Sequence, residues 1–281
     1  MCGICGFYSK SLTFDNTINK MNSAIFHRGP DDSGIWRDND AGVVFGHQRL
    51  SILDLSSAGH QPMKSNSGRF IVTYNGEIYN HLELRRELET KNPAVKWRSN
   101  SDTETLLEGI ETWGLELALS KIVGMFAFGL WDRKYRSLIL AKDRMGEKPL
   151  YFGWQGEGVN RVFLFGSELK ALRSHPGFLP EIDRDVLASY FRFNYVPAPH
   201  TIYKNVFKLQ PGSIAYINAE TIHRKIIPET YWSIPKVIER AKKSNFTGNE
   251  TEATDMLEEL LINVVKEQML SDVPLGAFLS G

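Results

Sequence analysis

The chain begins MCGICGFYS (Met1 to Ser9), a run of apolar and aromatic residues spaced by glycine. Short runs of this composition, bounded by glycine or polar residues, are typical of β-strands, so the sequence predicts a strand at the start of the chain. Both cysteines of the protein, Cys2 and Cys5, lie in this run. They are open to three interpretations: a metal or redox pair, buried packing residues, or a nucleophile that uses its own backbone amine.

The C-x-x-C spacing alone is weak evidence for a metal or redox site. A structural zinc site needs four ligands, and no second cysteine pair follows, while the seven histidines are scattered singly. Redox pairs lie at a helix N-terminus, where the dipole lowers the thiol pKa, whereas the residues around Cys2 and Cys5 predict a strand. We therefore expect no metal site, and we expect Cys5 to be a small buried residue.

Position distinguishes Cys2 from Cys5. Once Met1 is removed, one residue carries a thiol with an ordinary pKa of about 8.5 and a free α-amine with a pKa of roughly 7.7 to 8.0. Such an amine can act as general base to its own side chain, as in N-terminal nucleophiles. Because a cysteine near a terminus is more often incidental, other residues must decide between these interpretations.

The composition describes a folded protein without a nucleic-acid or membrane surface. Of the 281 residues 42% are hydrophobic, and 33 basic residues balance 33 acidic ones, so no positive excess favours nucleic acid. The longest uncharged apolar stretch near the middle, VGMFAFGLW (Val123 to Trp131), has nine residues, where a membrane span needs about 20. No signal peptide is visible and two cysteines suit a reducing compartment, so we expect a cytoplasmic location.

Seven segments are predicted to be strands, because they are rich in β-branched and aromatic residues and bounded by Gly, Asp or Asn. They cover residues 3–9, 42–47, 69–75, 125–132, 137–143, 150–154 and 162–167. Helices are predicted where apolar residues recur at helical spacing, around 18–25, 106–113 and 257–269. Ser101 and Glu104 form a capping-box pattern before the second helix. Strands and helices in blocks favour an α+β fold of two mainly antiparallel sheets with helices outside.

Four polar segments stand out, although each has an ordinary interpretation of its own. HRGPDDSG (27–34) has the composition of a loop, and HQRLSILD (47–54) places Arg49 at the end of an apolar strand, where a surface arginine is common. In YNGEIYNH (74–81) the Asn-Gly dipeptide is a turn signal. The Ser-Asp pair at 101–102 opens a helix, where an acidic residue complements the helix dipole.

Taken together with MCGICG, the order and spacing of these segments resemble the glutamine amidotransferase domain of the class II, N-terminal nucleophile family. The match is closest to glutamine-hydrolysing asparagine synthetases and extends over most of residues 1 to about 218. It includes DRMGEKPLYFG (143–153), FGSELKAL (165–172) and KLQPGS (208–213). The resemblance implies a four-layer αββα sandwich of two mainly antiparallel sheets, the N-terminal nucleophile hydrolase fold.

The resemblance also implies which residues perform catalysis. Cys2 would attack the side-chain amide of L-glutamine, and the freed α-amine would take and return the proton. The Asn75 side-chain amide and the Gly76 N–H would donate to the negative oxygen of the tetrahedral intermediate. Glutamate and ammonia would then be released through a thioester, with no cofactor.

Further residues would bind the two charged ends of glutamine. Arg49 would hold the α-carboxylate, because its guanidinium matches a carboxylate in two parallel hydrogen bonds. Two acidic residues would hold the α-ammonium: Glu77 and Asp102. Main-chain groups would line the same pocket at four positions: Leu50, Ser51, Ile52 and Leu53.

The composition changes near the end of the sequence. The resemblance implies a linker over 219–250, followed over 251–281 by the start of an α/β ATP-pyrophosphatase domain. The segment SDVPLGAFLSG (271–281) predicts a turn and an apolar strand, ending in the Ser-Gly that opens an ATP-binding SGGxDS loop. Leu279 matches a residue that contacts the nucleotide in the family. We therefore expect a chain cut within its phosphate-binding loop.

In a full-length enzyme of this kind, ATP with Mg²⁺ would activate a carboxylate acceptor, normally aspartate, which ammonia would convert to asparagine. Alternatives are an amidotransferase for another acceptor, such as a polysaccharide precursor or a sugar phosphate, a non-catalytic glutamine sensor, and a protein in which these residues only pack. The segment 271–281 argues against sugar-phosphate and phosphoribosyl amidotransferases, which carry different second domains. Apolar faces over 252–270 leave a homodimer open.

Overall fold

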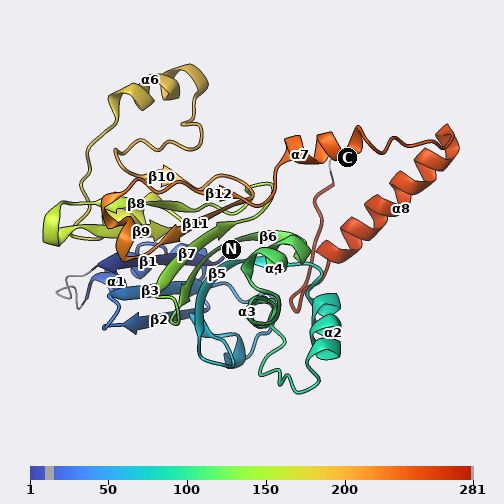
Figure 1. The fold of residues 1–281 in the computed structure, drawn as a ribbon, viewed down its shortest axis with the longest axis horizontal. Coiled ribbons are helices and arrows are strands. Elements are labelled where there is room, and N and C mark those ends of the chain that lie inside the picture. Colours follow the sequence, from blue (N-terminus) through green and yellow to red (C-terminus); the bar gives the residue numbers. More distant parts are fainter. Residues whose placement is uncertain (10–15, 280–281) are drawn as a thin grey trace.

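A computed structural model describes residues 1–9 and 16–279 and contains two six-stranded sheets (Figure 1). The first sheet has the strand order β10-β8-β9-β1-β3-β2, and every neighbouring pair is antiparallel. Its strands are β1 (Gly3–Ser9), β2 (Asp32–Asp38), β3 (Val43–Arg49), β8 (Tyr151–Gln155), β9 (Val162–Gly166) and β10 (Phe207–Lys208). The strand at the start of the chain therefore lies in the middle of a sheet.

The second sheet has the order β12-β11-β7-β6-β5-β4 and is also antiparallel throughout. Its strands are β4 (Met63–Lys64), β5 (Phe70–Ile78), β6 (Gly124–Asp132), β7 (Ser137–Lys142), β11 (Ser213–Ile217) and β12 (Glu229–Thr230). The central strands β5 and β6 pair along their whole length.

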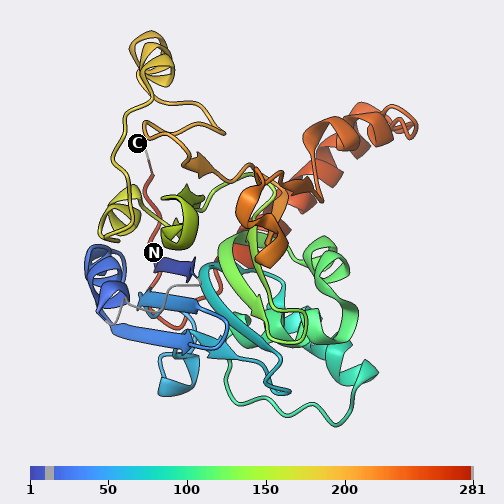
Figure 2. The same ribbon diagram turned by 60° about the vertical axis from the view of Figure 1, so that its left-hand side comes forward.

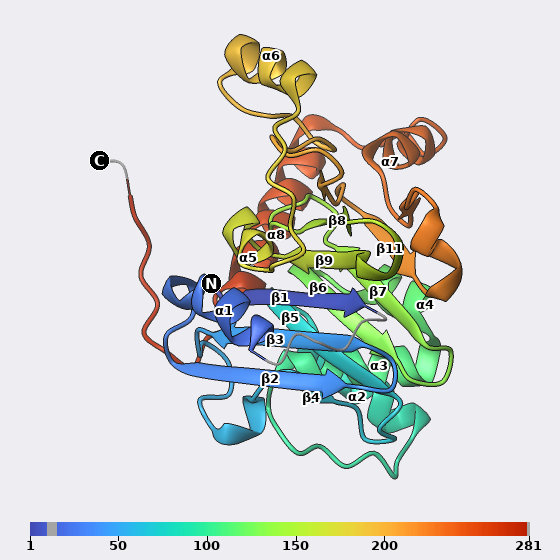
Figure 3. The same cartoon turned by 90° about the vertical axis from the view of Figure 1, so that its left-hand side faces the viewer.

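Helices cover the outer face of each sheet (Figure 3). Helices α1 (Thr17–Ser23) and α5 (Leu169–Arg173) lie on the first sheet, and α2 (His81–Lys91), α3 (Asp102–Trp113) and α4 (Leu115–Lys121) lie on the second. Three buried apolar clusters fill the spaces between the layers, one between the sheets and one under each helical layer. The predicted four-layer αββα sandwich is confirmed.

Three helices project from this body: α6 (Arg184–Phe193), α7 (Ile234–Ala241) and α8 (Glu250–Gln268) (Figures 1 and 2). The large apolar side chains of α8 are between 40% and 60% exposed. None of the helices in the described ranges has the length and apolar character that crossing a bilayer requires. Short 3-10 helices cover Phe26–Arg28, Ser57–Gly59, Gly158–Asn160 and Ala219–His223.

The seven predicted strands are all present, but four local expectations are wrong. Residues 32–34, expected in a loop, begin β2, because β3 offers them a free edge. The Asn-Gly pair at 75–76 lies inside β5 rather than in a turn, since β6 pairs with it on both sides. Glu104 does not complete a capping box: its carboxylate accepts from the Ser99 N–H (2.8 Å), while Ser101 alone caps α3. Residues 271–279 form no strand, and 280–281 lie outside the described ranges.

Phe165 of β9 fills the space between the two sheets. Its ring lies against Gly6 of the neighbouring strand β1 and against Gly129 of β6 in the opposite sheet. A Cβ atom added at these glycines would lie 2.5 and 2.8 Å from ring atoms. Phe165 also meets Phe45 edge to face, with ring centroids 5.6 Å apart. Both glycines are therefore required by the close approach of an aromatic ring.

We expect Phe165→Ala to lower the free energy of unfolding by about 3–5 kcal/mol, because it leaves a cavity between the sheets. Gly129→Ala should lower it by roughly 1–3 kcal/mol, because the added methyl group overlaps the ring. Denaturant unfolding measures both. Leu117→Ala on α4, where the side chain is 48% exposed, is the control and should change stability by less than about 0.5 kcal/mol. A Phe165→Ala variant as stable as the parent would contradict this packing.

Candidate active site

Cys2 lies directly before β1, and its position is fixed from two sides. The Leu50 N–H donates to Cys2 Sγ at 3.4 Å, and Arg28 Nε donates to the Cys2 carbonyl at 2.9 Å. Arg28 is in turn paired with Glu168 at 3.1 Å. The sulfur is therefore held at a defined point, although chain termini usually fray.

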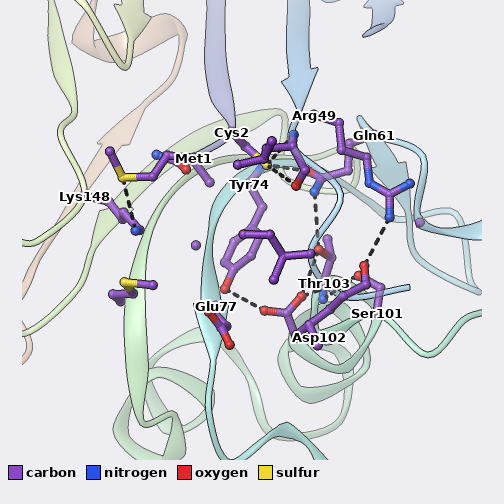
Figure 4. A pocket seen from close by; sticks show the side chains of 17 residues that line it. Met1, Cys2, Arg49, Gln61, Tyr74, Glu77, Ser101, Asp102, Thr103 and Lys148 are labelled. Atoms are coloured by element: carbon purple, nitrogen blue, oxygen red, sulfur yellow. Dashed lines mark hydrogen bonds between the residues drawn. The ribbon is translucent and has the colours of Figure 1, made fainter. Parts of the chain in front are cut away.

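One cavity brings together most of the predicted site residues (Figure 4). Its predicted lining residues are Cys2, Arg49, Leu50, Ile52, Leu53, Asn75, Gly76, Glu77 and Asp102. Cys2 lies at one end of the cavity and the two acidic side chains lie at the other (Figure 4). The cavity is also lined by residues that the sequence analysis did not assign to the site: Met1, Gly59, Gln61, Tyr74, Ser101, Thr103, Met125 and Lys148.

Two predicted site residues do not line this cavity. The Ser51 N–H donates to Asp31 Oδ2 at 2.8 Å, on the outer side of the loop that follows β3. Leu279, the predicted nucleotide contact, is 91% exposed. Within residues 1–9 and 16–279, no group of three or more His, Cys, Asp or Glu side chains could hold a metal ion.

Asn75 presents an unused donor to the cavity. Its side chain is 1% exposed, and no described residue accepts a hydrogen bond from Asn75 Nδ2. A buried amide without a partner is uncommon, because leaving the donor unpaired costs roughly 1–3 kcal/mol. The next residue must be glycine, since a Cβ on Gly76 would lie 2.4 Å from the Met125 carbonyl oxygen. The strand therefore holds a free hydrogen-bond donor in the cavity that the thiol also lines.

Asp102 supplies a buried carboxylate at the first turn of α3. Its Oδ2 accepts from the Tyr74 hydroxyl at 3.0 Å and from the Ile78 N–H at 2.8 Å. Burial raises the pKa of Asp102, and these hydrogen bonds act in the opposite direction. The second acidic residue, Glu77, has its pKa raised to about 7 by burial and by the charge of Asp102, against the effect of Lys148. A bound cation would favour the ionised form of both.

Arg49 is buried and holds the loop that follows β3. Its Nη1 donates to the Ser56 carbonyl at 3.0 Å, and its Nη2 donates to the carbonyls of Leu53, at 3.2 Å, and of Asp54. Gly59 makes room for this guanidinium, because a Cβ there would lie 2.0 Å from Arg49 Nη2. The side chain thus reaches the cavity. It also fixes residues 53–56, a second role that the sequence did not predict.

Lys148 is a residue of the cavity wall that sequence reasoning missed. The buried carboxylate of Asp143 accepts from the backbone N–H groups of Glu147 (2.9 Å) and Lys148 (3.0 Å), and so shapes the loop after β7. Lys148 Nζ lies 3.4 Å from Met1 Sδ, and burial lowers the pKa of its ammonium. The segment DRMGEKPLYFG carries this residue, but no local rule marks a lysine in such a loop as part of a site.

The thiol of Cys2 is not activated by its surroundings alone. Burial raises the pKa of Cys2, and the hydrogen bond from the Leu50 N–H only partly opposes this effect. A thiol in this state is mostly protonated at neutral pH and needs a base to become a nucleophile. Cys5 is completely buried, as the sequence predicted, and burial raises its pKa as well.

A thiol directly before a central strand, an unpaired amide and two acidic side chains line one cavity of an αββα sandwich. Together they have the features of a glutamine amidotransferase. The family described as "Glutamine amidotransferase domain" matches residues 1–232, and the chain belongs to this family. At 18% identity the chain also resembles the solved glutamine phosphoribosylpyrophosphate amidotransferase of Bacillus subtilis. That match has a TM-score of 0.58 and covers 82% of this chain and 49% of the other, and it supports the fold.

Several relatives at higher identity are named as asparagine synthetases. The chain is 37% identical to a putative glutamine-hydrolyzing asparagine synthetase 2 of Methanocaldococcus jannaschii, over 100% of this chain and 55% of that protein. It is also 37% identical to the glutamine-hydrolyzing asparagine synthetase 1 of Bacillus subtilis, over 100% of this chain and 42% of that protein. The chain thus spans about half the length of the curated relatives it matches. It is homologous to their glutaminase half, as the resemblance implied.

Glu77 should make stability depend on pH. Its folded pKa of about 7 lies above the ordinary value of 4.5, so the folded state holds a proton that the unfolded state loses between these values. Stability contributed by the protonated group is therefore lost as pH rises through about 7. We expect Glu77→Gln to be more stable than the parent at pH 8 and equally stable near pH 4. The difference at pH 8 should be roughly 1 kcal/mol, because the partial exposure of Glu77 screens the effect.

Thermal unfolding at several pH values measures this difference. The exposed residue Glu157 provides the control, since Glu157→Gln should keep the pH dependence of the parent. Parallel curves for the parent and Glu77→Gln would contradict the raised pKa.

Proposed function

We propose that this chain hydrolyses L-glutamine to glutamate and ammonia through a thioester on Cys2. The observation that carries the proposal is the shared cavity, which holds the Cys2 sulfur, the unpaired Asn75 amide and two acidic side chains. A nucleophile, a donor to developing negative charge and a site for an ammonium group are the parts that this reaction requires. The relatives named as glutamine-hydrolyzing asparagine synthetases support the same chemistry.

The reaction begins with a proton transfer inside Cys2. With Met1 removed, the α-amine takes the thiol proton, and the sulfur attacks the carboxamide carbon of glutamine. Asn75 Nδ2 and the Gly76 N–H donate to the oxygen that becomes negative. The amine returns the proton to the leaving nitrogen, the C–N bond breaks and ammonia departs. Water then hydrolyses the thioester, releasing glutamate and restoring the thiol.

The charged end of glutamine lies at the far side of the cavity in this proposal. Glu77 and Asp102 hold the α-ammonium, whose charge removes the repulsion between the two carboxylates. Arg49 holds the α-carboxylate. This carboxylate competes with the carbonyls of residues 53–56 for the Arg49 guanidinium. Leu50, Ile52 and Leu53 form a wall of the cavity beside Arg49.

We also propose that the ammonia serves a second domain, in the cytoplasm. A glutaminase domain over 1–218 is followed by a linker over 219–250, which includes the edge strand β12, and the second domain begins at 251. In the whole protein ATP with Mg²⁺ activates a carboxylate acceptor, normally aspartate, and other carboxylates such as a polysaccharide precursor remain candidates. The relatives' names support the aspartate acceptor.

The described residues do not themselves form a site for ATP and Mg²⁺. Leu279 is 91% exposed, and no group of three or more His, Cys, Asp or Glu side chains in the described ranges could hold the metal ion. In this proposal the ATP chemistry belongs to the second domain of the whole protein. In this chain the reaction uses only Cys2 and the groups around it, without a cofactor.

The first test replaces the nucleophile. Cys2→Ala should abolish glutaminase activity, because no other thiol reaches the cavity, and coupled glutamate detection measures the loss. A glutamine analogue with a diazoketone in place of the carboxamide should add once to the parent, at Cys2. Cys5→Ala is the matched control, since Cys5 is 0% exposed, and it should still be labelled. Undiminished hydrolysis by Cys2→Ala, or retention of Met1 in an active parent, would remove the mechanism.

The second test removes the unpaired amide. Asn75→Ala should lower kcat by about 10²- to 10³-fold, because one donor to the negative oxygen is lost, while KM changes by only a few fold. Asn66→Ala, on the turn between β4 and β5 and outside the cavity, should leave both constants unchanged. A change confined to KM would assign Asn75 to substrate binding instead.

A further inference from the structure

The chain that follows α8 returns to the loop at the active site. Asp272 lies 218 positions from Asp54 in the sequence, yet Asp272 Oδ2 accepts from the Asp54 N–H at 2.7 Å. In the opposite direction the Asp272 N–H donates to the Ile52 carbonyl at 3.0 Å. After this point the chain runs away from the body toward residue 279 (Figure 3). Two hydrogen bonds thus join the segment after α8 to the loop that follows β3.

The loop residue that Asp272 holds has a demanding conformation. Asp54 has φ of +55°, in the left-handed region that side-chain-bearing residues adopt at a cost. Its carboxylate accepts from the N–H groups of Ser56 (3.0 Å) and Asn100 (2.8 Å), and its carbonyl accepts from Arg49. The Asp54 N–H donates to Asp272. Asp272 therefore completes the set of contacts that keeps Asp54 in this conformation.

The same loop forms one wall of the cavity. Ile52, whose carbonyl accepts from Asp272, lines the cavity together with its neighbours Leu50 and Leu53. Leu50 also contacts the Cys2 sulfur. A shift of the loop at 52–54 would therefore change the space available for glutamine.

We propose that Asp272 is a positioning residue that fastens the glutamine-pocket loop to the segment leaving α8, an inference that rests on the proposed function. Because Asp272 is exposed, this contact opens easily in comparison with a buried pair. Movement of the segment after α8 is thereby transmitted to the pocket through Ile52 and Asp54. The pocket is fully ordered only when this segment is in place.

Three variants of the full chain test the role of Asp272. Asp272→Ala should raise KM for glutamine by roughly 3- to 10-fold, the range that one solvent-accessible hydrogen bond is worth, with kcat within about 2-fold of the parent. Asp272→Asn should restore most of the affinity, because its side-chain oxygen still accepts from the Asp54 N–H. Asp255→Ala is the matched control, an exposed acidic residue of α8, and it should change nothing. An unchanged KM in Asp272→Ala would overturn the inference.

Amide hydrogen exchange tests the contact without using activity. Exchange over residues 50–56 should be at least about 3-fold faster in Asp272→Ala than in the parent and in Asp255→Ala, since the Asp54 N–H loses its acceptor. Unchanged exchange would overturn the inference even if glutamine is hydrolysed. If the parent does not hydrolyse glutamine, the proposed function fails. Faster exchange in Asp272→Ala would then still support the fastening of the loop, and unchanged exchange would reject it.

Discussion

The pairing of β1 on both of its edges is the constraint on which the site depends. A nucleophile beside a chain terminus would ordinarily be mobile, yet β1 lies between β3 and β9 in the centre of a sheet. Cys5 pairs with Gly46 on one side and Gly166 on the other, so the sheet closes tightly around it. Cys2 lies three residues before Cys5, so the sheet fixes the position of Cys2 as well. The second cysteine therefore serves packing and the first is free for chemistry.

The charges in the cavity favour one kind of ligand. Asp102 is compensated by hydrogen bonds from Tyr74 and Ile78, whereas Glu77 faces the Asp102 charge with Lys148 as its cationic neighbour. Two carboxylates in one buried space resist being ionised together unless a cation joins them. A ligand with an α-ammonium group satisfies that condition, whereas an uncharged amide does not. In the proposed complex, the α-ammonium of free glutamine is the cation that joins the two carboxylates.

Sequence reasoning predicted the layers and the central strands because they depend on local composition. It missed β2 and misjudged the Asn-Gly pair at 75–76, since turn-forming residues were placed in strands by partners distant in the sequence. Lys148 could not be foreseen either, because a loop shaped by Asp143 brings it to the cavity. Composition also predicted a strand over 271–281, whereas an isolated edge segment has no partner strand within the described residues. The failures at β2, at the Asn-Gly pair and at 271–279 concern pairing between distant segments, whereas Lys148 and the missing capping box at Glu104 concern side chains that shape a loop.

The loop after β3 is held from two sides, and the two holds are not equivalent. Arg49 binds the carbonyls of residues 53–56 from inside the cavity, whereas Asp272 binds Ile52 and Asp54 from outside. In the proposed complex the substrate carboxylate competes for the Arg49 guanidinium and weakens the inner hold. The left-handed Asp54 then depends more strongly on Asp272. Docking of the segment after α8 supplies the hold on the loop that the bound carboxylate takes from Arg49, so glutamine binding and docking should favour each other.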